Sequence, residues 1–158
     1  MRLGRTGAVL YPSDNSVTCD LEKGGYLMGF FGSACDNIVD PAVDGSSYGV
    51  DAKAQRKCAQ ASDASFIASE SLSVNGGAPV IITTRPFEVF SPQEHVCLPV
   101  DNMFGITPRP ATLVAHAWVG ITKDLPLGLN TGVFHVEFTD GGSGTVPFTV
   151  NVVPRHHH

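Results

Sequence analysis

Oxygen-bearing side chains are concentrated in the loop Asp36 to Asp51. Counted from Asp40, oxygen ligands stand at positions one, five and twelve, which are Asp40, Asp44 and Asp51, with Gly45 at position six. This spacing overlaps the EF-hand loop, although position three has no oxygen ligand and no bidentate glutamate closes the loop. The three aspartates therefore form a candidate metal site, with calcium as the candidate ion. We favour the alternative interpretation, a surface loop whose aspartates cap turns and the following helix.

The same loop contains a candidate nucleophile. Residues 45–49 match the G-x-S-x-G pattern of a nucleophile elbow, with Ser47 in its centre and a helix expected to follow. The preceding segment is a poor strand, however, and the elbow belongs to folds with several helices. A triad would also need a histidine and a carboxylate, for which the chain offers His95, His116 and His135 and, for example, Asp101 and Asp124. A small secreted hydrolase with Ser47 as nucleophile is thus an alternative function.

Histidine, cysteine and methionine side chains are typical ligands of copper and zinc. The candidates here are His95, Cys97, Met103, His116 and His135. Their order along the chain differs from that of a blue-copper site, so we expect ordinary packed or exposed imidazoles. Trp118 is expected in the core rather than as a sugar-stacking platform. The last three histidines, in the tail 154–158, are interpreted as the remnant of a purification tag and excluded from the argument.

Four cysteines, without a CxxC pair, predict disulfide bonds rather than a zinc knuckle or a redox motif. Of three possible pairings we rank first Cys19 with Cys35 and Cys58 with Cys97, which would close loops of about 16 and 39 residues and contribute about 3 to 4 kcal/mol each. The alternative is four buried thiols in a cytosolic protein. Disulfides would indicate an oxidising compartment, so we expect a secreted, periplasmic or cell-surface protein whose signal sequence has been removed.

Composition limits the class of protein. The chain has 158 residues, 42% hydrophobic and 16% charged, with 17 glycines and 11 prolines, which fits one globular domain, 1–153, and argues against a bundle of long helices. The formal net charge of −5 opposes binding to nucleic acid. No apolar stretch approaches the length of a transmembrane segment.

Alternation of apolar and polar residues predicts the strands that must position these groups. It is clearest in residues 133–138 and 145–153, where Phe134, Val136 and Phe138 and then Val146 to Val152 share a face. The glycine-rich link 140–144 predicts a hairpin, and Pro147 predicts an outer edge or a bulge. Further strands are expected at 8–11, 17–21, 26–31, 80–84, 87–90, 96–100 and 111–122.

One segment breaks this pattern. Residues 51–61 are rich in helix formers, and Asp51 can serve as the N-cap. We expect a short helix whose stripe of Ala54, Cys58 and Ala61 docks on a sheet.

The sequence therefore predicts a mainly β, single-domain antiparallel β-sandwich with one short helix at 51–61. The closing hairpin resembles the last strands of extracellular immunoglobulin-like modules, over about the last 45 residues. The expected function is non-catalytic: a binding or assembly module that recognises a protein or a glycan through loops and edge strands.

Overall fold

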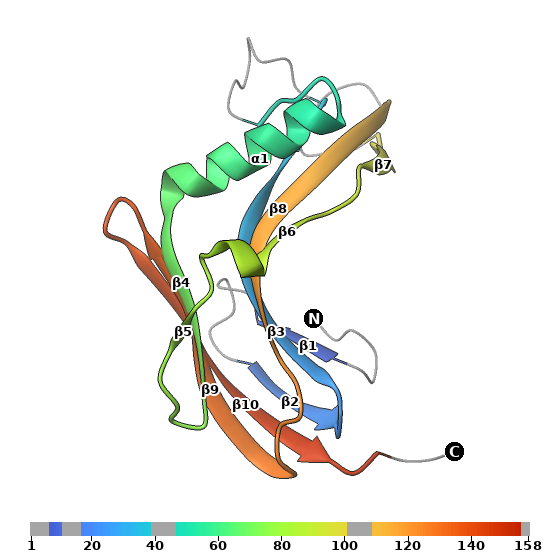
Figure 1. Ribbon diagram of the computed structural model, residues 1–158. Coiled ribbons are helices and arrows are strands. Elements are labelled where there is room, and N and C mark those ends of the chain that lie inside the picture. The colour runs from blue at the N-terminus through green and yellow to red at the C-terminus, as the bar shows by residue number, and fades with distance from the viewer. Residues whose placement is uncertain (1–6, 11–16, 39–46, 101–108, 156–158) are drawn as a thin grey trace. The chain divides into compact units, whose positions relative to one another are not determined.

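The computed structural model describes residues 7–10, 17–38, 47–100 and 109–155. They form two five-stranded sheets and one α-helix, so the expectation of a mainly β protein with one helix is confirmed (Figure 1). The elements are β1 (Gly7–Leu10), β2 (Val17–Glu22), β3 (Tyr26–Asp36), α1 (Ala52–Phe66), β4 (Ile67–Val74), β5 (Val80–Ile81), a 3-10 turn at Arg85–Phe87, β6 (Glu88–Phe90), β7 (Glu94–Cys97), β8 (Pro110–Thr122), β9 (Gly128–Phe138) and β10 (Ser143–Val153).

The first sheet has the order β1-β3-β8-β6, with β7 also paired to β8, and the second has the order β2-β10-β9-β4-β5. The expected closing hairpin is the antiparallel pair β9–β10. Two pairs, β1–β3 and β2–β10, are parallel, so the expectation of a purely antiparallel architecture is wrong. The cause is connectivity: β2 joins the far side of β10 instead of forming a hairpin with β3.

The chain divides into two compact units, which we describe separately. Unit 1 comprises Met1–Phe31, Ile67–Glu88 and Trp118–His158, and unit 2 comprises Gly32–Phe66 and Val89–Ala117. Both β3 and β8 contribute residues to each unit.

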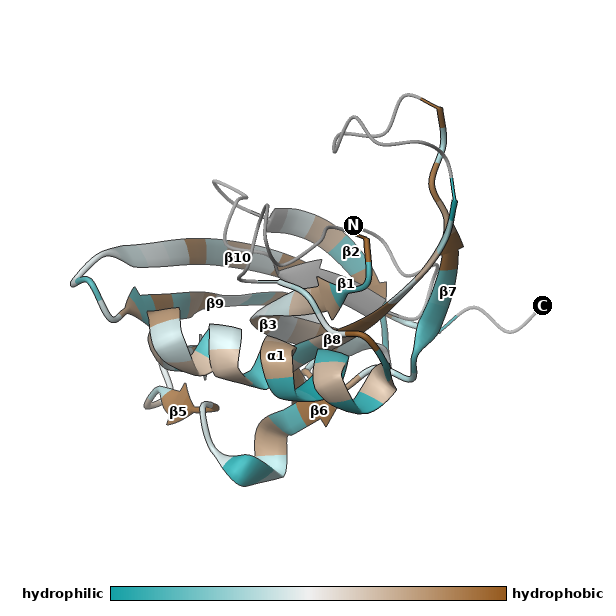
Figure 2. Ribbon diagram, turned by 90° about the horizontal axis from the view of Figure 1, so that it is seen from above, coloured by the Kyte–Doolittle hydropathy of each residue, from teal (hydrophilic) through white to brown (hydrophobic). Residues whose placement is uncertain are grey.

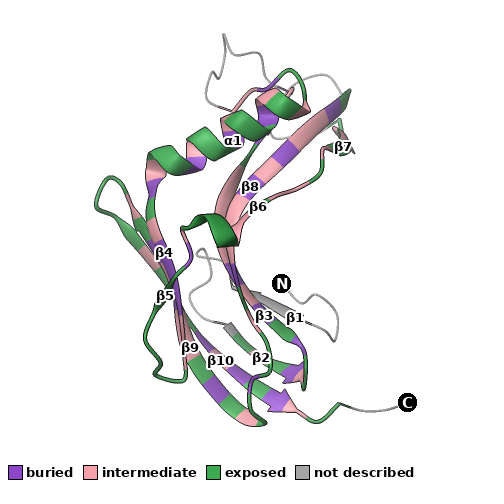
Figure 3. Cartoon of the chain, in the orientation of Figure 1, coloured by how far each residue is buried: buried purple, intermediate pink, exposed green. Residues whose placement is uncertain are grey.

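The core of unit 1 follows the alternation seen in the sequence. In β10 every second residue is buried, namely Val146, Phe148, Val150 and Val152 (Figure 3). Phe134 of β9 is fully buried, and its ring lies against Gly29 of β3, where a Cβ would come within 2.9 Å of it. Pro147 pairs with Val133 of β9, and the described pairing of β10 with β2 begins at the next residue, Phe148.

Unit 2 holds the helix. The Asp51 carboxylate accepts a hydrogen bond from the Ala54 N–H at 2.8 Å, which confirms the predicted N-cap. The helix extends to Phe66, beyond the expected end at residue 61. Its buried residues are Gln55, Ala59 and Asp63, and Ala61 is exposed, so the predicted stripe is wrong at Ala61, whereas Cys58 does reach the sheet through its disulfide to β3. The spacing of apolar residues does not reveal the buried face of this helix, because two of its buried residues, Gln55 and Asp63, are polar and hydrogen-bonded.

Candidate functional site

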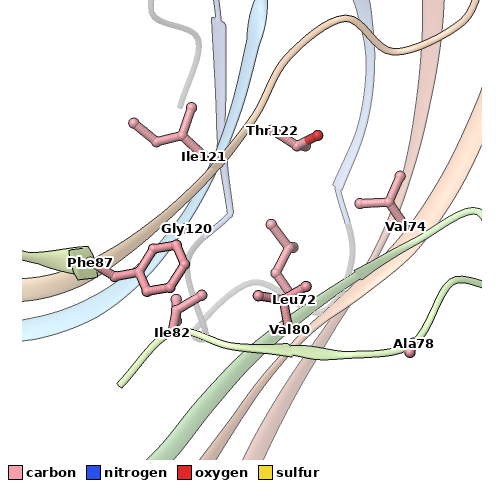
Figure 4. Close-up of a pocket in the computed structure, with 9 residues that line it drawn as sticks. All are labelled: Leu72, Val74, Ala78, Val80, Ile82, Phe87, Gly120, Ile121 and Thr122. Carbon is pink, nitrogen blue, oxygen red and sulfur yellow. The ribbon is translucent and has the colours of Figure 1, made fainter. Parts of the chain in front are cut away.

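Unit 1 contains an apolar pocket. Its volume is about 310 Å³, near the lower end of the range of about 300 to 1,000 Å³ that ligand pockets occupy. Its lining comes from the end of β4, the segment that carries β5 and the 3-10 turn, and the end of β8. The lining residues are Leu72, Val74, Ala78, Val80, Ile82, Phe87, Gly120, Ile121 and Thr122 (Figure 4).

The register of β4 and β5 explains why these side chains converge. The two strands are antiparallel, with Leu72 paired to Val80, so both side chains stand on the same face and meet in the pocket. Ile82 follows two residues after Val80 and lies on that face too, with 1% of its surface exposed. Figure 4 shows the ring of Phe87 beside Ile82, with Val74 on the other side of Leu72 and Thr122 above Leu72 in this view.

Gly120 is important to the shape of the pocket. A Cβ at this position would lie 3.2 Å from two carbon atoms of Ile82 and 3.5 Å from Leu72. The absence of a side chain at residue 120 therefore leaves room above the buried floor of the pocket.

The chemistry of the lining is simple. Thr122 is the one lining residue with a polar side chain, and the others are aliphatic, glycine or phenylalanine. Around the pocket, Val80, Ile81 and Ile121 are each about half exposed, and β5 stands out as hydrophobic in Figure 2. The site can thus desolvate an apolar group, but it offers little that would orient a polar one.

A second cluster, in unit 2, is polar and buried. Nδ1 of His116 lies 2.6 Å from Oδ2 of Asp63, and both side chains are fully shielded from solvent. The ring of Phe90 is tilted over the His116 imidazole at a centroid distance of 4.7 Å, and the Arg56 guanidinium lies 4.6 Å from the Phe90 centroid. Because the carboxylate and imidazole are inaccessible, this cluster fixes α1 on β8 rather than contacting a ligand.

Gln55 makes the other polar attachment of α1. Its amide donates to the carbonyl oxygen of Gly49 at 3.0 Å and to the hydroxyl of Thr112 at 2.8 Å, and its own oxygen accepts from Gln93 at 2.9 Å. Gly49 is required for this contact, since a Cβ there would lie 2.3 Å from the backbone nitrogen of Gln55. The buried glutamine is thus satisfied on both sides of its amide.

One disulfide is present among the described residues, and it joins Cys35 of β3 to Cys58 of α1 with a Cα–Cα distance of 5.9 Å. Cys19 and Cys97 remain thiols. The prediction of a disulfide is confirmed, but the pairing ranked first is wrong. Loop length along the chain could not reveal that α1 lies against β3, which is what brings Cys58 within reach of Cys35.

The other predicted site residues are not gathered into one site. Asp40 and Asp44 lie outside the described residues, and the Asp51 carboxylate is used as the helix cap. Ser47 is half-buried and its carbonyl oxygen accepts from the Asp36 N–H. Within the described ranges, no group of three or more histidine, cysteine or acidic residues is arranged to hold a metal ion.

The three candidate histidines are in different surroundings. His95 is exposed on β7, and His116 is bound to Asp63. Nδ1 of His135, on β9, lies 2.9 Å from the Thr145 hydroxyl. Met103 and Asp101 lie outside the described residues, whereas Asp124 is exposed and has a φ of 61°.

The comparisons with known proteins assign no family. No family model matches the chain, and no curated protein matches it. Two solved structures are similar, each with a TM-score of 0.32: amebosin, at 12% identity over 95% of this chain and 100% of that one, and a cysteine protease inhibitor from Entamoeba histolytica, at 8% identity over 94% and 96%. Similarity at this level assigns neither a fold family nor an activity. No helix among the described residues has the length and apolar character needed to cross a membrane.

Proposed function

We propose that this protein is an extracytoplasmic binding module that holds an apolar side chain of a protein partner in the pocket of unit 1. The observation that carries the proposal is the lining of that pocket, in which Thr122 supplies the one polar side chain. A glycan needs several hydrogen-bonding groups, whereas a leucine or phenylalanine side chain needs an apolar surface to replace water. The lining therefore favours a protein over a glycan.

The disulfide supports the proposed location. Disulfides persist in oxidising compartments and are rare in the cytosol. The Cys35–Cys58 bridge is therefore consistent with a secreted, periplasmic or cell-surface protein.

The proposal is tested with small probes on the full chain. N-acetyl-leucine methylamide and N-acetyl-phenylalanine methylamide are titrated while the methyl signals of Leu72, Val74 and Ile82 are followed by NMR. N-acetyl-alanine methylamide and N-acetylglucosamine serve as matched probes. We expect saturable shifts with a Kd in the millimolar range or weaker for the large side chains only, because one buried side chain contributes about 1.5 to 3 kcal/mol.

Two variants localise the binding. Ala78→Trp places a large ring at an exposed lining position and should abolish the shifts, whereas Leu127→Trp, at an exposed position outside the lining, should preserve them. The proposal is wrong if the large probes cause no saturable shift in the native protein, or if N-acetylglucosamine binds better than they do.

A further inference from the structure

The link between β4 and β5 begins with an asparagine followed directly by a glycine, Asn75 and Gly76, and residues 75–80 are all exposed. The Gly77 N–H donates to the carbonyl oxygen of Val74 at 2.9 Å, and φ is 51° at Asn75 and 72° at Gly76. Positive φ at both central residues is typical of a type I′ turn, in which Asn-Gly is a preferred pair. The pair is therefore suited to the turn that it forms.

The Asn75 side chain fastens this turn to β9. Its Oδ1 accepts a hydrogen bond from the Thr131 N–H at 3.0 Å, and its Nδ2 donates to Oδ1 of Asn130 at 2.8 Å. The backbone N–H of Asn75 also donates to the carbonyl oxygen of Thr131 at 2.7 Å. We call the two side-chain hydrogen bonds the Asn75 clasp.

The asparagine on the other side of the clasp is fixed in orientation. Asn130 is fully buried, and its Nδ2 donates to the carbonyl oxygens of Pro126 and Gly128, each at 2.9 Å. A flip of its amide would place Oδ1 against those two carbonyl oxygens, which are acceptors as well. The Oδ1 atom that faces Asn75 must therefore be met by a donor, which the Asn75 amide nitrogen supplies.

Asparagine before glycine is also the pair most open to deamidation, because glycine has no side chain that hinders attack by its backbone nitrogen. In this reaction the Gly76 nitrogen gives its proton to hydroxide and forms a bond to Cγ of Asn75. The Cγ–Nδ2 bond breaks, and ammonia leaves after taking up a proton from water. Water then opens the cyclic imide at one of its two carbonyl carbons, so that residue 75 becomes aspartate or isoaspartate.

The clasp and this reaction exclude each other. Attack requires Cγ of Asn75 to move toward the Gly76 nitrogen and to become tetrahedral, whereas the clasp holds a planar amide against β9 through both of its polar atoms. The reaction would therefore proceed only from turns that have opened locally. Exposure of the turn gives water and hydroxide access to it.

The product cannot close the clasp again. A carboxylate at residue 75 has no hydrogen to donate, and it would set a negative charge against Oδ1 of Asn130. Val74 precedes the site and Ala78 follows it, and both line the pocket. Release of the turn would therefore loosen one wall of the pocket.

We propose that Asn75 is a site of spontaneous covalent modification that the clasp to Asn130 keeps unreactive, and that its conversion to aspartate or isoaspartate releases the β4–β5 turn irreversibly. The modification goes beyond the proposed function and does not depend on it. Only the effect of the modification on binding in the pocket rests on that function.

The test is the rate of conversion at residue 75 in the full chain, followed by peptide mapping and mass spectrometry during incubation at mildly alkaline pH. We expect the folded native protein to react at least about ten-fold more slowly than the same protein in urea, because two hydrogen bonds must open first. Asn151 is the internal control, since it is exposed but precedes the branched residue Val152, and it should react more slowly than Asn75 in urea.

Two pairs of variants test the clasp and its loss. Asn130→Ala removes an acceptor and should raise the rate in the folded protein about five-fold, whereas Leu129→Ala, at the neighbouring exposed position, should leave the rate unchanged. Asn75→Asp reproduces one product and should lower the midpoint of thermal unfolding by about 3 to 8 °C. Leu127→Asp adds the same charge at another exposed position of unit 1 and should lower that midpoint by less than about 1 °C.

The outcomes separate the modification from the proposed function. The proposal is overturned if residue 75 stays unmodified in urea, if folded and unfolded protein react at the same rate, or if Asn75→Asp unfolds at the temperature of the native protein. If Asn130→Ala does not fold, the comparison of folded with unfolded native protein decides. If Asn75→Asp binds N-acetyl-leucine methylamide as tightly as the native protein does, the effect on the pocket is wrong, and if the native protein does not bind that amide, the proposed function alone is wrong.

Discussion

The two units have interiors of different kinds. In unit 1, β9 and β10 contribute a regular set of buried apolar side chains, including Phe134, Val136 and Phe148. In unit 2, α1 buries Gln55 and Asp63, and it is joined to the rest of the unit by a disulfide and by specific hydrogen bonds. Unit 1 is therefore stabilised mainly by non-directional burial, whereas unit 2 depends on a few directional contacts.

This difference bears on function. Buried apolar side chains can stabilise a unit even where its surface is open, provided that the core beneath that surface is well packed. The pocket of unit 1 lies over such a core. In unit 2 the buried side chains of Gln55, Asp63 and His116 are hydrogen-bonded within the unit, although Oδ1 of Asp63 has no hydrogen-bond partner among the described residues. The proposed binding pocket thus lies in the unit whose buried side chains are mostly apolar.

The largest effect is expected from Phe134→Ala. This side chain is fully buried and its ring fills the space above Gly29, so its loss should lower the free energy of unfolding by about 4 kcal/mol. Urea unfolding followed by circular dichroism measures the change. Leu129→Ala, on the same strand but 75% exposed, should change it by less than about 0.5 kcal/mol. Equal effects for the two variants would contradict the assignment of the core.

The second-largest effect is expected from Asp63→Ala, which should lower the free energy of unfolding by about 3 to 4 kcal/mol. The substitution leaves the buried His116 imidazole without its carboxylate. The double variant Asp63→Leu with His116→Leu should recover much of that loss, because two apolar side chains can replace a buried pair at little cost. A double-mutant cycle built from Asp63→Leu, His116→Leu and the double variant, followed by urea unfolding, measures the coupling, and additive single effects would show that unit 2 does not rely on this pair.

Removal of the disulfide is expected to cost about 3 kcal/mol. Cys35 and Cys58 are 23 residues apart, and opening a loop of that length increases the entropy of the unfolded chain. The variant Cys35→Ala with Cys58→Ala is compared with Cys97→Ala, in which an exposed thiol is lost. Hydrogen exchange should show reduced protection in α1 of the double variant, and unchanged protection there would contradict the distinction between the two units.

The smallest effect is expected in β5, where it tests which backbone N–H group faces β4. Val80→Pro removes an N–H that faces β4 and should cost about 1 kcal/mol, whereas Ile81→Pro should change stability by less than about 0.5 kcal/mol. Thermal unfolding of the pair measures the difference. The reverse order would mean that the register at this edge is wrong by one residue.

Much of unit 1 could be predicted from the sequence because its strands are amphipathic. The alternation of Phe134 and Val136, and of Val146 to Val152, indicated the hairpin and its buried face. The N-cap at Asp51 was also identified, since capping depends on local residues only.

Other features could not be predicted, for identifiable reasons. Strand β4 was missed because Ile67–Val74 is rich in serine and carries a buried Glu70, which hides its alternation. The buried face of α1 was misplaced because Gln55 and Asp63 occupy positions where apolar residues are expected. The pocket depends on the register of β4 against β5 and on Gly120, and neither leaves a signal in the sequence.

The order of segments along the chain also limits how this protein can be dissected. Unit 2 is assembled from two separate stretches, and the stretch between them, Ile67–Glu88, belongs to unit 1. That stretch contains β4, an interior strand of the second sheet, together with most of the pocket wall. A truncated fragment long enough to keep both parts of unit 2 would therefore take β4 away from β9, so no single cut in the gene yields two intact pieces.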